Sequence, residues 1–255
     1  MELTWLGTAG FILKAGNLEF AFDPFLSRGP DNQSPFNAKS FQNTRAIYVG
    51  HGHFDHTYDI PEIVKHSDVE IVAPGLTGFI LRMRGVPANR IKTSHNDMYL
   101  LKDLKMRAFK SSHVRFDAKL VLSTMKRCGF RDCLNIACLG LGYPEGLVQS
   151  YSFEFKGKRF LYLSTAGCTE SELKLYRDLE VDYMFSPLQG HSRIQSLVAD
   201  QIAIVAPKVV IPHHYDDFYP PLSQTICVDA FEEELKKRHF KGKLQIVPLF
   251  ETVQI

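Results

Sequence analysis

A run of histidines directly after a short apolar segment constrains this chain more than any other feature. Residues 51–56 read His-Gly-His-Phe-Asp-His, and they follow the apolar residues 46–49, Ala-Ile-Tyr-Val. The apolar segment predicts a buried strand, and Gly50 and Gly52 allow a sharp turn where it ends. The three imidazoles and the carboxylate are therefore expected on a loop at a strand end, where side chains from one rigid edge converge.

Imidazole and carboxylate together are ligands that zinc, iron and manganese share, whereas calcium and magnesium prefer oxygen alone. The alternative is a solvated polar turn that is rich in histidine by chance. The chain has 10 histidines among 255 residues, so three of them within six positions favour a transition-metal site.

At this point the sequence resembles a known family. The H-x-H-x-D-H pattern in residues 51–56 is similar to the signature of the metallo-β-lactamase superfamily. Residues 5–11, the Asp-Pro-Phe corner at 23–25 and the Ile-Pro-His-His-Tyr run at 211–215 resemble its lactonase-like branch, the small bacterial hydrolases related to ascorbate-6-phosphate lactonases. The resemblance spans about residues 2 to 220. It implies an α/β fold of the four-layer αββα type, whereas the hydrophobic periodicity alone shows only mixed helix and strand.

The resemblance also implies two neighbouring metal sites. The expected ligands are His51, His53 and His113 for the first metal, and Asp55, His56, Cys168 and His214 for the second. Cys168 stands where most relatives have an aspartate that bridges two metals, and a thiolate also binds zinc. The alternative for Cys168 is a buried, inert cysteine beside a degraded second site. His213 is the alternative to its neighbour His214.

The metal expected at these sites is zinc, with one or two ions per chain. A thiolate ligand favours zinc over manganese, and His53 departs from the His-x-Glu-x-Asp pattern of the superfamily's di-iron flavoproteins. Manganese and iron are therefore the less favoured alternatives.

The implied chemistry is hydrolysis by a metal-bound hydroxide. Asp55 would both bind metal and orient the nucleophile, and His191 is a second catalytic candidate. His191 and Arg193 precede an expected helix and could hold an anionic group, although Arg193 could equally lie on a solvated helix face. Thr8, where many relatives have histidine, and Tyr215 are further candidates for contact with the substrate.

The composition limits which classes of binding partner the sequence supports. The chain carries 30 Lys and Arg against 28 Asp and Glu, a formal charge of +2, so it offers no electrostatic case for nucleic acid or an anionic membrane. Its first residues lack a basic leader region, and no apolar run approaches about 20 residues. We expect a cytoplasmic protein with a small-molecule substrate, anionic or neutral, and leave oligomerisation open. Residues 1–255 are expected to form one domain with an inserted subregion at about 114–144, which holds Cys128, Cys133 and Cys138.

Three functions remain open at this stage. The first is a metal-dependent hydrolase of a small ester, lactone or phosphoester. The second is a phosphodiesterase that acts on a nucleotide or nucleic acid. The third is a non-catalytic metal-binding protein whose second site is degraded.

Overall fold

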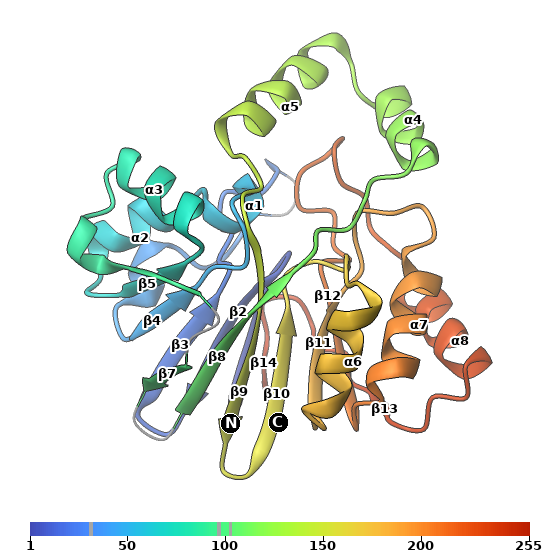
Figure 1. The fold of residues 1–255 in the computed structure, drawn as a ribbon. Coiled ribbons are helices and arrows are strands. Elements are labelled where there is room, and N and C mark those ends of the chain that lie inside the picture. The colour runs from blue at the N-terminus through green and yellow to red at the C-terminus, as the bar shows by residue number, and fades with distance from the viewer. Residues whose placement is uncertain (31–32, 96–97, 102–103) are drawn as a thin grey trace.

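Two sheets lie face to face in this protein, and helices cover their outer sides (Figure 1). The structure is a computed structural model that describes residues 1–30, 33–95, 98–101 and 104–255. One apolar cluster lies between the sheets, and two more lie beneath the helices on either side. The predicted four-layer αββα sandwich is therefore confirmed.

The first sheet has seven strands among the described residues, in the order β14-β1-β2-β3-β4-β5-β6. Its strands are β1 (Glu2–Gly7), β2 (Gly10–Ala15), β3 (Leu18–Phe22), β4 (Ala46–Tyr48), β5 (Glu70–Ala73), β6 (Ile91–Thr93) and β14 (Thr252–Gln254). The neighbours from β3 to β6 are parallel, so their carboxyl ends meet at one edge. Asp23 follows β3 at this edge, and the loop that carries His51 follows β4.

The second sheet also has seven strands among the described residues, in the order β13-β12-β11-β10-β9-β8-β7. Its strands are β7 (Met98–Leu101), β8 (Leu104–Ser111), β9 (Val148–Phe155), β10 (Lys158–Leu163), β11 (Tyr183–Pro187), β12 (Val209–His213) and β13 (Lys243–Leu244). β8 and β10 both run antiparallel to β9, and β10 to β12 are parallel. β8, β10 and β12 therefore end at the same edge, where His113, Ser164 and His214 follow them.

Helices cover the outer face of each sheet. The helices are α1 (Phe54–Thr57), α2 (Ile60–His66), α3 (Gly75–Met83), α4 (Ala118–Arg127), α5 (Phe130–Gly142), α6 (Glu170–Asp178), α7 (Ile194–Val205) and α8 (Val228–Lys237), with short 3-10 helices at Ala38–Phe41 and Ala88–Arg90. α2 and α3 pack on the first sheet, and α6, α7 and α8 pack on the second (Figure 1). Local sequence explains such packing: α6 begins with a capping box formed by Thr169 and Glu172 and buries Leu173 and Tyr176.

Aromatic side chains fill the space between the sheets. Phe22 of the first sheet stacks on Tyr162 of the second, with 4.3 Å between ring centroids. Phe153 stacks on Phe160 within the second sheet at 4.6 Å. Large rings bury much apolar area at low conformational cost, so this layer holds the two sheets, and the loops at their common edge, in a fixed relation.

Helices α4 and α5 differ from the others because neither buries a single residue. They occupy the subregion for which an insertion was predicted, and Figure 1 shows them as an arch above the edge where the strands end. Among the described helices, none combines the length and apolar character needed to cross a bilayer.

Candidate metal centre

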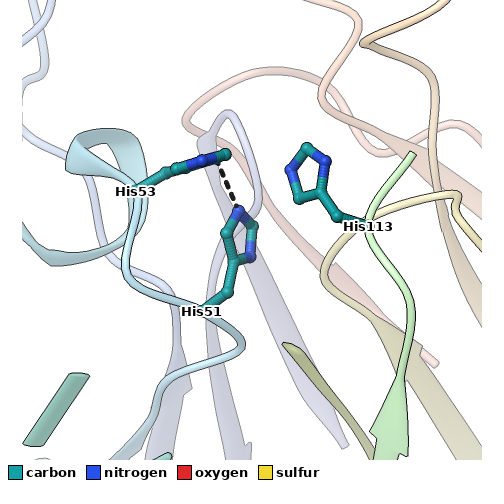
Figure 2. A group of neighbouring side chains, drawn as sticks. All are labelled: His51, His53 and His113. Atoms are coloured by element: carbon teal, nitrogen blue, oxygen red, sulfur yellow. Dashed lines mark hydrogen bonds between the residues drawn. The ribbon is translucent and has the colours of Figure 1, made fainter. Parts of the chain in front are cut away.

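Three imidazoles from two sheets converge at the common strand edge, and we call them the first group. They belong to His51, His53 and His113, and their ligand atoms lie within 4.8 Å of one another. Figure 2 shows the three rings around one point, with a dashed line between His51 and His53. Nε2 of His51 lies 3.0 Å from Nδ1 of His53. The structure therefore brings together the three histidines that the sequence analysis assigned to the first metal.

Neighbouring groups outside the cluster contact one ring nitrogen of His51 and one of His113, and so leave the other nitrogen of each ring facing the first group. Nδ1 of His113 lies 2.7 Å from the carbonyl oxygen of Val114, which only accepts, so this nitrogen carries the proton and Nε2 is free. Nδ1 of His51 lies 3.4 Å from the hydroxyl of Ser164. That hydroxyl donates to the carbonyl of Gln149, so its oxygen can accept a hydrogen bond from the N-H of His51. Such outer contacts set the tautomer of a metal-binding histidine.

A second group lies beside the first and consists of Asp55, His56 and His214, whose ligand atoms also lie within 4.8 Å of one another. Nε2 of His214 is 3.1 Å from Oδ2 of Asp55, and Nε2 of His56 is 3.8 Å from the same oxygen. The ring centroids of His51 and His56 are 3.9 Å apart, so the two groups form one continuous cluster.

Sequence reasoning missed the residue that orients His56. Asp23 is fully buried, and its Oδ2 lies 2.8 Å from Nδ1 of His56. The same carboxylate accepts a hydrogen bond from the backbone N-H of Gly50 at 2.7 Å and one from the hydroxyl of Tyr162 at 2.6 Å. The Asp-Pro-Phe corner contained this residue, but the motif served only to mark the resemblance. Asp23 directs Nε2 of His56 towards the second group.

Burial and mutual repulsion keep the first group neutral in the protein without metal. Burial, followed by the charges of neighbouring histidines, holds the pKa of His51 well below its ordinary value. Burial is also the largest cause that lowers the pKa of His53 and of His113. Neutral imidazole is the form that binds metal, so these shifts favour a ligand role.

In the second group, neighbouring charges outweigh burial in their effect on the pKa values. Burial alone would lower the pKa of His56, but the carboxylates of Asp23 and Asp55 outweigh it and raise that pKa. Burial alone would raise the pKa of Asp55, but His56 and His214 lower it. An ionised carboxylate next to imidazoles is a common donor set for zinc, iron and manganese, so both groups fit a transition metal.

Close backbone packing brings the ligand loops together. A Cβ atom on Gly50 would lie 2.1 Å from the Cβ of Ser164, and one on Gly167 would lie 2.0 Å from the carbonyl carbon of His113. Only glycine permits these approaches. The loop after β10 therefore lies directly against the loops that carry His51 and His113.

The structure places Cys168 apart from both groups. Its thiol contacts Ser111 and lies near Glu172 and Tyr176, against the cluster beneath the helices. Burial raises the pKa of this thiol to about 12. The residues of this loop that reach the cavity beside the histidines are instead Ser164 and Thr165. The hypothesis that Cys168 is a ligand of the second metal therefore has no support in the geometry.

His214, and not His213, joins the second group. His213 is fully buried, with its Nε2 3.0 Å from the carbonyl of Leu163 and its ring stacked on Tyr162. His214 has a positive φ of 58°, which turns its side chain away from the strand. Its backbone N-H donates to the carbonyl of Thr8 at 2.8 Å.

Thr8 and Tyr215 support the site from behind and do not contact the cavity. Thr8 is fully buried with a φ of 53°, and its N-H donates to the carboxylate of Asp216. Asp216 pairs with the guanidinium of Arg28 at 2.5 Å. The ring of Tyr215 lies 4.6 Å from that of Trp5 within the core. Neither side chain is among the residues that line the cavity, so the predicted contacts with substrate are absent there.

His191 and Arg193 also lie outside the cavity lining, although Gln189 and Gly190 belong to it. Nδ1 of His191 accepts a hydrogen bond from the backbone N-H of Arg193 at 3.0 Å, and Arg193 is exposed. The structure thus does not bring the predicted catalytic histidine to the metal groups, and Arg193 is exposed at the N-cap of α7.

The two groups open on one cavity of about 520 Å³. His51, His53, Asp55, His56, His113 and His214 all line it, and residues of α4 and α5 form its opposite wall. Two metal-donor groups at the bottom of one cavity, at the carboxyl ends of strands in an αββα sandwich, define a metallohydrolase-type site.

Comparison with known proteins gives the family. The sequence model of the β-lactamase superfamily domain matches residues 19–215. The chain therefore belongs to the metallo-β-lactamase superfamily, as the sequence resemblance predicted. Nothing in the comparisons assigns it to the lactonase-like branch, which stays a prediction.

Relatives along the whole chain carry the same description. A metal-dependent hydrolase of Alkaliphilus metalliredigens is 26% identical over 238 residues, which cover 92% of this chain and 93% of that protein. A metal-dependent hydrolase of Staphylococcus aureus is 24% identical over 260 residues, with full coverage of both chains. The solved structure of Igni18, a metallohydrolase of the archaeon Ignicoccus hospitalis, has a TM-score of 0.71 at 17% identity and covers 99% of this chain and 97% of that one. The two sequence relatives support a metal-dependent hydrolase, and the structural likeness shows the same fold.

Proposed function

We propose that this protein is a zinc-dependent hydrolase with one zinc in each group, and that it cleaves an ester or lactone of a small molecule. The observation that carries the proposal is that both donor groups face the same cavity. A bound zinc lowers the pKa of a coordinated water from about 15.7 to about 7 and polarises the oxygen of the bond under attack.

The chain's own residues orient the reactants. The side chain of Asp55 is 10% exposed, and its lowered pKa keeps it a hydrogen-bond acceptor at neutral pH, so it can orient the attacking water. The half-buried rings of His53 and His113 line the cavity, so a carbonyl group bound there would lie against the first group. With His191 outside the cavity, solvent water is the proposed donor of the proton that the leaving group takes.

The cavity favours a carbonyl centre over a phosphodiester. Among the described residues that line it, Arg127 is the only lysine or arginine. Its guanidinium donates to the hydroxyl of Ser123 at 3.0 Å. Enzymes that bind phosphodiesters place several cations around the phosphate. Away from the two zinc ions proposed above, a nucleotide or nucleic acid would find Arg127 as the one cationic side chain among the described lining residues.

The test combines metal content with turnover. Protein purified without chelator or metal-binding tag should contain about two zinc ions per chain and should hydrolyse p-nitrophenyl acetate or a γ-lactone. His53→Ala should lose about a thousandfold in kcat/KM, since it removes a ligand from the first group. His66→Ala is the matched control, because His66 lies on α2 and pairs only with Glu62 there.

Each contrary result points to a different function. Zinc-loaded protein that turns over no ester or lactone contradicts the proposal and favours a non-catalytic metal-binding role. Faster turnover of bis-p-nitrophenyl phosphate than of any ester, lost in His53→Ala, would assign a phosphodiesterase. Equal activity of His53→Ala and His66→Ala would mean that the first group takes no part in the reaction.

A further inference from the structure

Helices α4 and α5 each present one face to the cavity. Most cavity-lining positions of the two helices follow the spacing i, i+3, i+4, i+7. They are Val121, Thr124, Met125 and Cys128 for α4 and its end, and Cys133, Ile136, Ala137 and Gly140 for α5, and Leu120, Arg127 and Leu139 line the cavity beside them. This spacing places each set on a single helix face. Both faces are mainly apolar, and both look into the same space above the metal groups.

No protein core packs against these apolar faces. No residue of either helix is buried, and Val121 and Met125 remain 43% and 60% exposed. A helix that packs on a protein core normally buries its apolar face, as α7 does in this chain. The apolar faces of α4 and α5 instead border a cavity of about 520 Å³, a size typical of small-molecule sites.

Specific contacts hold both ends of the arch. At the start of α4, Asp117 accepts hydrogen bonds from the backbone N-H and the hydroxyl of Ser192, at 2.9 Å and 2.6 Å. After α5, the guanidinium of Arg84 lies 3.7 Å from the ring centroid of Tyr143 and donates to its hydroxyl at 2.6 Å. It also donates to the carbonyl of Gly142 at 2.7 Å. The wall above the metal groups is therefore a built part of the site.

Apolar side chains also line other parts of the cavity wall. Phe54 and Phe218 line it, with their ring centroids 6.3 Å apart, and Leu222 lies nearby. The polar floor consists of the metal-donor groups. The space thus has one reactive end and one long apolar wall, which is the arrangement expected for a molecule with a polar head and an apolar body.

We propose that the space between α4, α5 and the histidine groups binds the hydrocarbon chain of the substrate, which makes the preferred substrate an ester or lactone with a medium-length acyl chain. This inference rests on the proposed hydrolase function and names its substrate class. The occupant is a substrate because the cavity is continuous with the donor groups: anything that fills it contacts His53 and His113. A second copy of the chain or a lipid surface seated there would close access to the site.

A series of p-nitrophenyl esters from acetyl to decanoyl, each below its micelle concentration, tests the chain pocket. In the zinc-loaded protein, kcat/KM should rise about threefold to fourfold per added methylene until the pocket is filled. Ile136→Asp, on the cavity face of α5, should lose about tenfold or more with the decanoyl ester and less than about twofold with the acetyl ester. Leu134→Asp is the matched control, because Leu134 is 56% exposed on the same helix and does not line the cavity.

A binding measurement separates this inference from the hydrolase proposal. In calorimetric titrations of metal-free protein with hexanol, octanol and decanol, affinity should tighten about threefold to fourfold per methylene, and Ile136→Asp should abolish the trend. Graded alkanol binding without turnover of any ester would support the chain pocket and reject the hydrolase proposal. Turnover with no dependence on chain length would overturn the inference while the hydrolase stands.

Gel filtration tests the alternative that a second copy of the chain covers these helix faces. A wild-type dimer that Ile136→Asp dissociates would show that a second copy covers the apolar faces, and this would also overturn the inference. An unchanged oligomeric state in Ile136→Asp and Leu134→Asp, with the chain-length dependence lost only in Ile136→Asp, supports it.

Discussion

Replacement of Asp23 by asparagine tests how the second group is organised. Oδ2 of Asp23 lies 2.8 Å from Nδ1 of His56, a contact that favours a proton on Nδ1 and leaves Nε2 available to a metal. An amide nitrogen at the same position is a donor and would favour the other tautomer, with the proton on Nε2. That proton occupies the site where a metal would bind.

The expected magnitude follows from this exchange. Loss of an outer partner of a metal-binding histidine lowers metal affinity by about 10- to 100-fold, which corresponds to about 1.4 to 2.8 kcal/mol. The N-H of Gly50, at 2.7 Å from Oδ1 of Asp23, can still donate to the amide oxygen. The ligands of the first group do not contact the side chain of residue 23. The loss of affinity should therefore be confined to the zinc of the second group.

Competition with zinc chelators of graded affinity measures both dissociation constants. Asp59→Asn is the matched control, because Asp59 is also buried and accepts hydrogen bonds from Leu26 and Ser27 without touching a site histidine. Thermal melting of both metal-free variants reports any general loss of stability. If Asp23→Asn binds two zinc ions as tightly as Asp59→Asn does, Asp23 does not set the tautomer of His56 and the reasoning fails.

Three further predictions concern Cys168, metal removal and the core. Cys168→Ser should leave the zinc content measured by elemental analysis unchanged, and at pH 8 Cys168 should be alkylated on the order of a thousandfold more slowly than an exposed thiol, because its pKa is about 12; loss of one zinc or rapid modification seen by mass spectrometry would contradict its placement. Chelation should abolish ester turnover and added zinc should restore it, whereas activity in zinc-free protein would exclude a metal role. Phe153→Ala should lower the free energy of unfolding in urea by about 3 to 5 kcal/mol, since this ring is 2% exposed between the sheets; a loss below about 1 kcal/mol would show that the layer repacks.

Much of the donor set was predictable because it is local in sequence. His51, His53, Asp55 and His56 lie within six residues after a strand, and backbone connectivity alone keeps them together. His113 and His214 required the resemblance, since they lie 57 or more positions beyond this segment. Their positions at one edge follow from the strand directions of the second sheet, with β8 antiparallel to β9 and β12 parallel to β11, and periodicity does not reveal these directions.

The loop conformation after β10 explains why Cys168 does not reach the site. Cys168 was chosen by a motif register, but β10 ends at Leu163 and the chain reaches the cavity at once, with Ser164 and Thr165. By Cys168 the loop has already turned towards α6. A shift of a few residues in a loop is invisible to a motif, because glycine-rich turns set where each side chain points.

Other features depend on tertiary contacts and could not be predicted from the sequence. Asp23 acts on His56 across 33 residues, and its role depends on the burial of both groups. The apolar residues of α4 and α5 have the spacing of a packed helix, and only the structure shows that no core lies beneath them. The three-residue strand β14 (Thr252–Gln254), which pairs with β1, is too short to be identified by periodicity.

The donor groups join the two sheets. His51, His53 and His56 follow β4 of the first sheet, whereas His113 and His214 follow strands of the second. A metal held by both halves can bind only while the sandwich is closed, so binding is linked to folding. Each tenfold rise in free metal above its dissociation constant then adds about 1.4 kcal/mol to the free energy of unfolding per site. The resistance of this fold to heat should therefore report the metal supply of its surroundings.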